Sequence, residues 1–208
     1  METKLLCFLY YLYMTICCCC GKIVHAIESP KYTVIFSESN FQIRLYDESL
    51  WMSAPVSGTS FEQSTKTGFH RLYQYIHGAN LNSSKLAFTS PVLTRIPSPS
   101  SQDGYTVRIY VSPHFQGKPP LPNPELKLQV EKWKTQCLAV LKFSGYAKDS
   151  DISREFEALA SSLNKHFNRS SGTIQDASSY TIAQYNAPIR NSGRLNEVWL
   201  KVSGLENC

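Results

Sequence analysis

The chain has 208 residues, enough for one domain with a substantial core, and its hydrophobic content of 42% is ordinary for a globular protein. Its formal net charge of +5 comes from scattered Lys and Arg residues without a basic run or arm, so we expect no nucleic-acid partner. The 12 Tyr and 10 Phe favour a β-rich core, with an aromatic-lined ligand cavity as the alternative.

The first 26 residues differ in composition from the rest of the chain. Lys4 precedes an uncharged run of 16 residues, and Val24 and Ala26 suit a cleavage site. The run is shorter than the roughly 20 residues that span a bilayer, and a retained signal anchor is the alternative. We therefore predict a signal peptide over residues 1–26. The single domain over residues 27–208 would then be secreted or reside in the endomembrane lumen, without membrane attachment after cleavage.

Cysteines and sequons bear on the same question. Five of the seven cysteines lie in the leader, which leaves Cys137 and Cys208 and no metal-ligand spacing. The two could pair in an oxidising compartment, but we favour Cys137 as a small buried hydrophobe and Cys208 as an unpaired terminal residue. The sequons at Asn82 and Asn168 follow predicted helices and indicate a glycoprotein.

The first half of the domain combines strands with one helix. Strand-like runs lie, in chain order, at residues 32–36, 41–46, 50–58, 85–96 and 105–112. The first two runs flank a turn-like segment and predict a hairpin. From residue 61 to residue 77 the period is helical, with one face formed by Phe61, Thr65, Gly68, Leu72 and Ile76. Ser60 is the expected N-cap of this helix and Gly78 its C-terminal stop.

A proline-rich stretch, residues 113–124, predicts a stiff extended connector between the halves. The second half then repeats the order of the first. Strands are expected at residues 126–132 and 135–143 with a tight turn at Trp133-Lys134, a helix at 151–167, and strands at 180–185 and 196–202. Asp149 or Ser150 is expected to cap the second helix. A strand–strand–helix–strand–strand unit thus occurs twice, which predicts two half-sheets, each covered by one helix.

Four segments in register resemble the SOUL haem-binding protein family. They are Tyr32 with residues 42–46, then residues 68–80, 89–92 and 194–200. The resemblance covers roughly residues 28–202 and implies an α+β fold, an antiparallel barrel-like sheet flanked by two long helices. In the last segment, a strand that buries Val198 and Leu200 on one side has no packing need for Asn-Glu followed by Trp. We expect Glu197 to pair with Arg44 there, and Trp199 to wedge between sheet and helix.

Catalytic motifs are missing from the sequence. It contains no Gly-x-Ser-x-Gly elbow, no His-Glu-x-x-His pair and no phosphate-binding glycine loop, so we expect no enzymatic activity. The first helix has a second stripe of side chains, turned by roughly 100° from its core stripe. It consists of Lys66, Phe69, His70, Tyr73 and His77. Such a flank suits a flat apolar anion, and the plain alternative is a solvated helix surface.

The family resemblance implies that a haem or porphyrin lies against this helix in a shallow apolar groove. Carried over position by position, the binding residues would be Lys66, Phe69, His70, Tyr73, Gln74 and Phe88. Some relatives have a His in the Ile-Arg-x-Tyr segment, where this chain has Leu45, which cannot ligate iron. We therefore expect haem or a metal-free porphyrin to bind without a strong axial ligand, or through another residue such as His70.

The resulting hypothesis is a carrier, buffer or scavenger of tetrapyrroles. Leu45 and the bulky Tyr73 motivate an alternative, a non-enzymatic protein-interaction module that kept the fold without the ligand. An enzyme acting on tetrapyrroles is a third hypothesis, disfavoured by the missing catalytic set.

Overall fold

The structure is a computed structural model that describes residues 27–208 except 59, 99–100, 102, 116, 168–172, 175–178, 188 and 206–207. The predicted leader and the sequon at Asn168 lie outside these described residues. Within them, no helix is both long enough and apolar enough to cross a membrane.

The elements follow the predicted order closely. The strands are β1 (Tyr32–Ser37), β2 (Phe41–Tyr46), β3 (Ser49–Val56), β4 (Val92–Ile96), β5 (Tyr105–Tyr110), β6 (Gln129–Trp133), β7 (Gln136–Ser144), β8 (Thr173–Ile174), β9 (Tyr180–Gln184) and β10 (Leu195–Ser203). The helices are α2 (Phe61–Ile76) and α3 (Asp149–His166), and short 3-10 turns occur at Pro113–Phe115 and Pro124–Leu126 in and beside the proline-rich connector. The predicted β1–β2 hairpin is confirmed.

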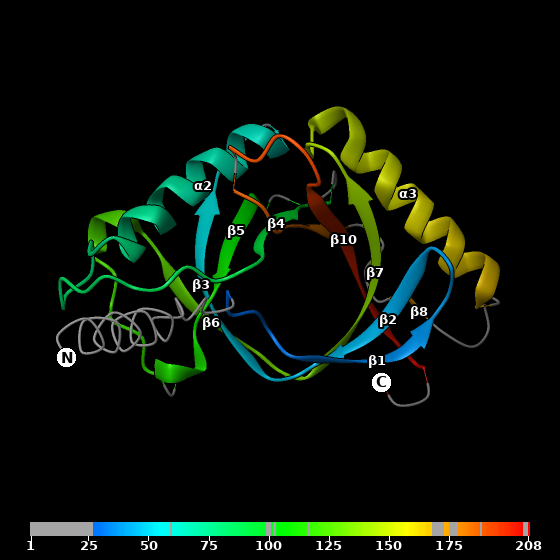
Figure 1. Cartoon of the computed structure of the whole chain (residues 1–208), viewed down its shortest axis with the longest axis horizontal. Coiled ribbons are helices and arrows are strands. Elements are labelled where there is room, and N and C mark those ends of the chain that lie inside the picture. Colours follow the sequence, from blue (N-terminus) through cyan, green and yellow to red (C-terminus); the bar gives the residue numbers. More distant parts are fainter. Residues whose placement is uncertain are drawn as a thin grey trace, which may run out of the picture.

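Two long bent strands run through the whole sheet: β2 continues into β3, and β6 continues into β7. β2 pairs with β7, with Tyr46 opposite Gln136, and β3 pairs with β6, with Ser49 opposite Trp133. Both ladders share one register, so β2–β3 and β6–β7 form a single antiparallel ribbon. The pairings β3–β5, β5–β4, β4–β9, β9–β10 and β10–β7 lead from one side of this ribbon back to the other. The sheet therefore curls into a barrel (Figure 1).

The continuous ribbon corrects one prediction. Trp133-Lys134 was expected to be a tight turn between two neighbouring strands, but β6 pairs with β3 and β7 pairs with β2 and β10. The chain bends at this point and continues into the other half of the barrel. The interrupted β pattern at Trp133-Lys134 marks this bend. It was interpreted as a turn because a bend and a hairpin turn interrupt the alternation of side chains in the same way.

The duplicated unit is visible in the pairing. In the first unit β5 pairs with β3, and in the second β10 pairs with β7, while β4 and β9 meet at the junction between units. Helix α2 packs on the outside of β3 and β5, and α3 packs on β7 and β10 (Figure 1). The predicted α+β architecture, with a barrel-like sheet and two long helices, is confirmed.

Strand alternation divides the core into layers inside and outside the barrel. Beneath α2 lie Met52, Ala54, Val107 and Ile109, together with Leu72 of the helix. Gly68 brings the helix close to the sheet here, since a Cβ at this position would lie 2.6 Å from the Cβ of Val107. A second cluster beneath α3 is built on Ile43, Ala139, Leu159, Val198 and Leu200.

The predicted boundaries of α2 are confirmed. The Ser60 hydroxyl accepts a hydrogen bond from the Gln63 N–H at 3.3 Å, and Gly78 has a φ of +109° just beyond the helix. Helix α3 differs from the prediction, because its N-cap is Lys148 and not Asp149 or Ser150. The Asp149 carboxylate instead accepts from the Phe61 N–H of α2 at 2.6 Å, while Glu62 accepts from the Asp149 N–H at 3.1 Å. The two helices therefore cap one another.

The predicted strand over residues 85–96 is too long. β4 begins at Val92, and the residues before it form a connector beside the end of α2. The Leu86 N–H donates to the Ile76 carbonyl at 2.8 Å, and Thr89 makes an isolated bridge with Glu28. These contacts use the backbone groups that a strand would pair with a neighbour, so Phe88 lies in the connector.

A disulfide joins Cys137 to Cys208 across 71 residues of sequence, with their Cα atoms 5.7 Å apart. The preferred interpretation of two unpaired cysteines was therefore wrong. Cys137 is indeed buried beneath α3, but its thiol is bonded to the terminal residue. The bond fastens the end of the chain to β7 close to Leu205, which also packs on that cluster.

Candidate functional site

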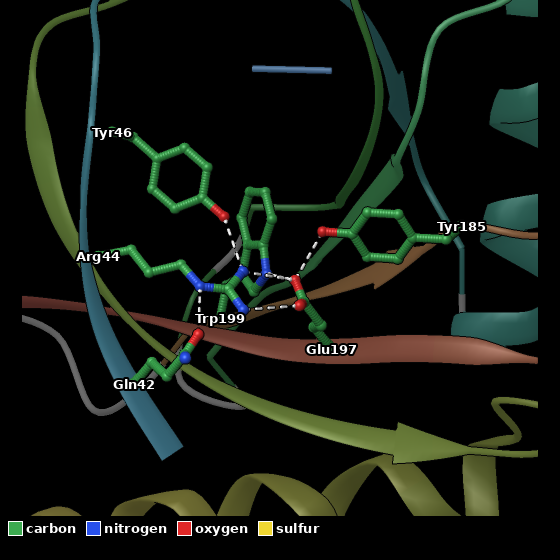
Figure 2. Close-up of polar contacts among 6 residues, drawn as sticks. All are labelled: Gln42, Arg44, Tyr46, Tyr185, Glu197 and Trp199. Atoms are coloured by element: carbon green, nitrogen blue, oxygen red, sulfur yellow. Dashed lines mark hydrogen bonds and ion pairs between the residues drawn. The ribbon is translucent and has the colours of Figure 1, made fainter. Parts of the chain in front are cut away.

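A buried ion pair lies inside the barrel. Arg44 of β2 donates to both carboxylate oxygens of Glu197 on β10, at 3.0 Å from Nη2 to Oε1 and 3.2 Å from Nη1 to Oε2 (Figure 2). The two side chains are only 1% and 2% exposed. The predicted Arg44–Glu197 pair is thus confirmed, in the bidentate geometry that is the strongest for a guanidinium and a carboxylate.

Neighbouring groups complete this pair. Glu197 Oε2 also accepts from the Tyr185 hydroxyl at 2.6 Å and from Trp199 Nε1 at 2.8 Å (Figure 2). Arg44 Nε donates to Gln42 Oε1 at 3.0 Å. Burial raises the pKa of Tyr185, and the Glu197 charge raises it further, so its hydroxyl remains a donor. Burial alone would lower the pKa of Arg44, but the charge and hydrogen bonds of Glu197 raise it.

Trp199 is part of the interior and not of a sheet–helix interface, which corrects the prediction for this residue. It packs against Tyr46 at a ring-centroid distance of 4.9 Å, in a cluster whose members come from strands. The reason is the alternation of β10, which directs Val198 and Leu200 toward α3, and Glu197 and Trp199 into the barrel.

A second ion pair occupies the equivalent position in the other half of the barrel. Arg108 of β5 donates to Glu131 of β6 at 2.7 Å from Nε to Oε2, and Trp133 Nε1 donates to the same oxygen at 3.5 Å. In each pair, a strand that begins a unit (β2 or β6) is joined to a strand that ends a unit (β10 or β5). The arginine lies on the beginning strand in one pair and on the ending strand in the other. Burial would raise the pKa of Glu131, but the hydrogen bonds and charge of Arg108 outweigh burial and lower it.

The barrel interior is filled by its own side chains. Tyr46, Trp51, Tyr110 and Trp199 are each less than a tenth exposed, so little space next to them can admit a water molecule. The polar groups of the Arg44–Glu197 pair are already satisfied by protein partners. This pair therefore leaves no polar group of its own for a ligand to satisfy.

Four rings form an exposed cluster on the flank of α2, here named the α2 aromatic surface: Phe69, Tyr73, His77 and Phe88. Tyr73 stacks on His77 with ring centroids 3.9 Å apart, and Phe88 lies 6.1 Å from Tyr73 and 5.6 Å from His77. Tyr73 and Phe88 are 43% and 47% exposed, whereas Phe69 is half-buried on the core beneath α2. The rings thus stand on a packed base and face outward.

Polar groups border this surface. Lys66 is exposed one turn before Phe69 and His70, on the same side of the helix, and within the described residues no carboxylate pairs with it. Gln74 Nε2 lies 3.1 Å from His70 Nδ1. His77 Nδ1 lies 2.8 Å from the Tyr73 carbonyl, so when this nitrogen carries the proton it donates there and Nε2 remains free.

The structure brings the predicted binding residues together. Lys66, Phe69, His70, Tyr73 and Gln74 share one flank of α2, and Phe88 reaches that flank from the connector. His77 was on the predicted stripe but not in the predicted binding set. Its position four residues after Tyr73 puts the two rings side by side on the helix, which was enough to include it. Lys66, His70, Tyr73 and His77 are exposed, so none of the strands that the structure describes covers this flank.

Comparison with known proteins bears on what the fold and surface are for. The sequence model of the SOUL heme-binding protein family matches residues 27–201. The chain belongs to the SOUL family. Among curated SOUL relatives, Heme-binding protein 2 of Homo sapiens is 30% identical over 164 residues, which cover 77% of each chain. Heme-binding protein 1 of Xenopus laevis is 31% identical over 162 residues, 76% of this chain and 82% of the relative.

Solved structures share the SOUL domain's fold at low identity. The C-terminal domain of EcmrR has a TM-score of 0.54 at 10% identity and covers 84% of this chain and 99% of its own. A hydrolase from Listeria innocua has a TM-score of 0.51 at 8% identity and covers 80% of this chain and 93% of its own. At such identities the likeness concerns the fold alone.

The α2 aromatic surface of this SOUL domain fits a tetrapyrrole in two respects, flat aromatic rings for the macrocycle and an unpaired cation for its carboxylates. An iron ligand is a separate matter. Leu45 packs with the cluster beneath α3, not with the one beneath α2, so that strand position and the α2 surface belong to different parts of the molecule. Among the described residues, no group of three or more His, Cys, Asp or Glu could hold a metal ion.

Proposed function

We propose that this protein binds haem or a related tetrapyrrole on the α2 aromatic surface, as a non-enzymatic carrier, buffer or scavenger. The observation that carries the proposal is the exposure of Tyr73, His77 and Phe88 along the flank of α2 that also carries Lys66. Large aromatic groups that remain exposed together usually mark a binding surface. The names of the curated relatives support haem as the ligand.

The ring of the ligand would lie on Tyr73, Phe88 and Phe69, which gain by losing contact with water at roughly 25 cal/mol per Å² of apolar area. A propionate would pair with Lys66 as a charge-assisted contact. Gln74 and His70 offer further hydrogen-bonding groups along the same edge. Because neither contribution involves iron, we expect haem and metal-free porphyrin to bind comparably, without a strong axial ligand.

The proposed location is the secretory route, either outside the cell or in the endomembrane lumen. Disulfides persist in oxidising compartments and are rare in the cytosol. The Cys137–Cys208 bond supports this location, as do the composition of residues 1–26 and the two sequons.

The test is a titration of purified protein with haemin and with protoporphyrin IX, followed by absorbance and by tryptophan quenching. We expect similar dissociation constants for the two, and Lys66→Glu to weaken both about tenfold, since replacing attraction by repulsion costs about 1.4 kcal/mol. Lys165→Glu is the matched control, because it makes the same charge change on exposed α3.

Two results would contradict the proposal. If Lys66→Glu and Lys165→Glu changed the dissociation constants equally, the α2 aromatic surface would not be the binding site. No uptake of either macrocycle by folded protein would remove tetrapyrrole binding altogether and favour the alternative, a protein-interaction module on the same fold.

A further inference from the structure

The loop after α2 contains a sequon held in a defined conformation. Asn82, followed by Ser83 and Ser84, is exposed in the turn that leads from His77 back to Phe88. The Leu86 N–H closes this turn by donating to the Ile76 carbonyl at 2.8 Å. The acceptor asparagine is therefore exposed in the loop that joins two members of the α2 aromatic surface, His77 and Phe88, in the sequence.

Asn80 organises the loop from within, and its side chain is 2% exposed. Its Oδ1 accepts from the Asn82 N–H at 3.2 Å and from the Ser84 N–H at 3.1 Å, and its Nδ2 donates to the Tyr75 and Ser84 carbonyls at 3.1 and 2.8 Å. Asn80 therefore holds the backbone of the sequon, and the Asn82 side chain is exposed.

An apolar pair lies directly beside this asparagine. The Leu81 N–H donates to the Leu121 carbonyl at 2.8 Å, which brings the two residues side by side. They are 62% and 61% exposed, far more than leucine usually is in a folded domain. Two exposed leucines side by side form an aggregation liability unless something covers them.

We propose that Asn82 carries an N-linked glycan that lies over the Leu81–Leu121 pair. The inference rests on the secretory location proposed above, since the glycan is added in the lumen. The sequon supplies the acceptor, the Asn80 contacts hold its backbone, and the leucine pair provides an apolar surface for the glycan to cover.

The test uses the full chain of residues 1–208, produced in a eukaryotic secretory host. Glycopeptide mapping with and without peptide N-glycosidase F reports modification at residue 82. With the second sequon removed by Asn168→Gln, we expect the enzyme still to lower the intact mass, and Asn82→Gln in that background to abolish the shift. Asn164→Gln, an exposed asparagine outside any sequon, is the matched control and leaves the shift unchanged.

A separate measurement, the binding of an apolar dye, tests whether the glycan covers the leucine pair. We expect Asn82→Gln to raise binding of an apolar dye by the folded protein, and Leu81→Ser with Leu121→Ser to reverse that rise. An unmodified residue 82 in the folded secreted protein overturns the inference, as does retention of the full chain in the cytosol. Both readings are independent of pigment uptake, so failure here is distinguishable from failure of haem binding.

Discussion

The barrel interior and the α2 aromatic surface use similar side chains in opposite ways. Inside, Arg44 and Glu197 are buried, and each polar group of the pair has a protein partner. On α2, Lys66 and the rings of Tyr73 and Phe88 are exposed, and the lysine has no acidic partner within the described residues. The first arrangement leaves nothing for a ligand to satisfy, whereas the second leaves both charge and ring area available.

This difference separates the sequence features of the family from its binding chemistry. The Arg-Leu-Asn-Glu-Val-Trp-Leu segment is the strongest signature in the chain, yet Glu197 and Trp199 serve the interior of the barrel. A domain can therefore keep this signature while its outer surface changes. With the ligand on the α2 aromatic surface, as proposed, changes to the two regions should have separable effects on stability and on binding.

Breaking the interior pair is expected to have the largest effect. Arg44→Met leaves the Glu197 carboxylate buried without its cation, which should lower the free energy of unfolding by about 3–5 kcal/mol. Adding Glu197→Gln should recover part of the loss, because the uncompensated charge is removed. Urea denaturation of the wild type, the two single variants and the double variant gives a coupling energy. A loss in the double variant equal to the sum of the two single losses would mean that the two groups do not interact.

Opening the disulfide should have the next largest effect. Cys208→Ser releases a link between residues 71 apart in sequence, and the chain-entropy relation predicts a loss of about 4 kcal/mol. The terminal segment around Leu205 should then become accessible to carboxypeptidase, while tetrapyrrole affinity per folded molecule stays unchanged. The same protein in strong reductant serves as the control, since it should match the variant. Stability equal to that of the oxidised wild type would contradict the predicted loss.

Gly68 connects the two regions, because it sets how closely α2 approaches the barrel. The Cβ of Gly68→Ala would overlap Val107, so the variant should lose about 1–3 kcal/mol and shift the helix that presents the α2 aromatic surface. Both stability and tetrapyrrole affinity are then expected to fall together. Val107→Gly added to Gly68→Ala should restore affinity, because it removes both the Cβ and the methyl group that the new Cβ would overlap, and a failure to rescue would contradict this explanation.

The regular elements were predictable from sequence because their patterns are local. The helical period beginning at Phe61 and the cap at Ser60 depend on residues a few positions apart. The Arg44–Glu197 pair was also expected, whereas the inward direction of Trp199, which strand alternation implies, was missed. The bend at Trp133 could not be distinguished from a hairpin, since only the pairing partner differs. The Cys137–Cys208 bond depends on where the tail lies, and the Asp149 contacts depend on how two distant helix ends meet.

The smallest expected effect on stability is also the sharpest test of the comparison. Tyr73→Ser removes an exposed ring from the α2 aromatic surface, so unfolding should change by no more than about 0.5 kcal/mol, while tetrapyrrole affinity falls about tenfold. Tyr146→Ser is the matched control, because Tyr146 is similarly exposed, at 46% against 43%, and lies outside the surface. If both substitutions weakened binding equally, ring exposure in general would explain the uptake. An effect confined to Tyr73 would instead tie binding to α2 while the barrel interior remained intact.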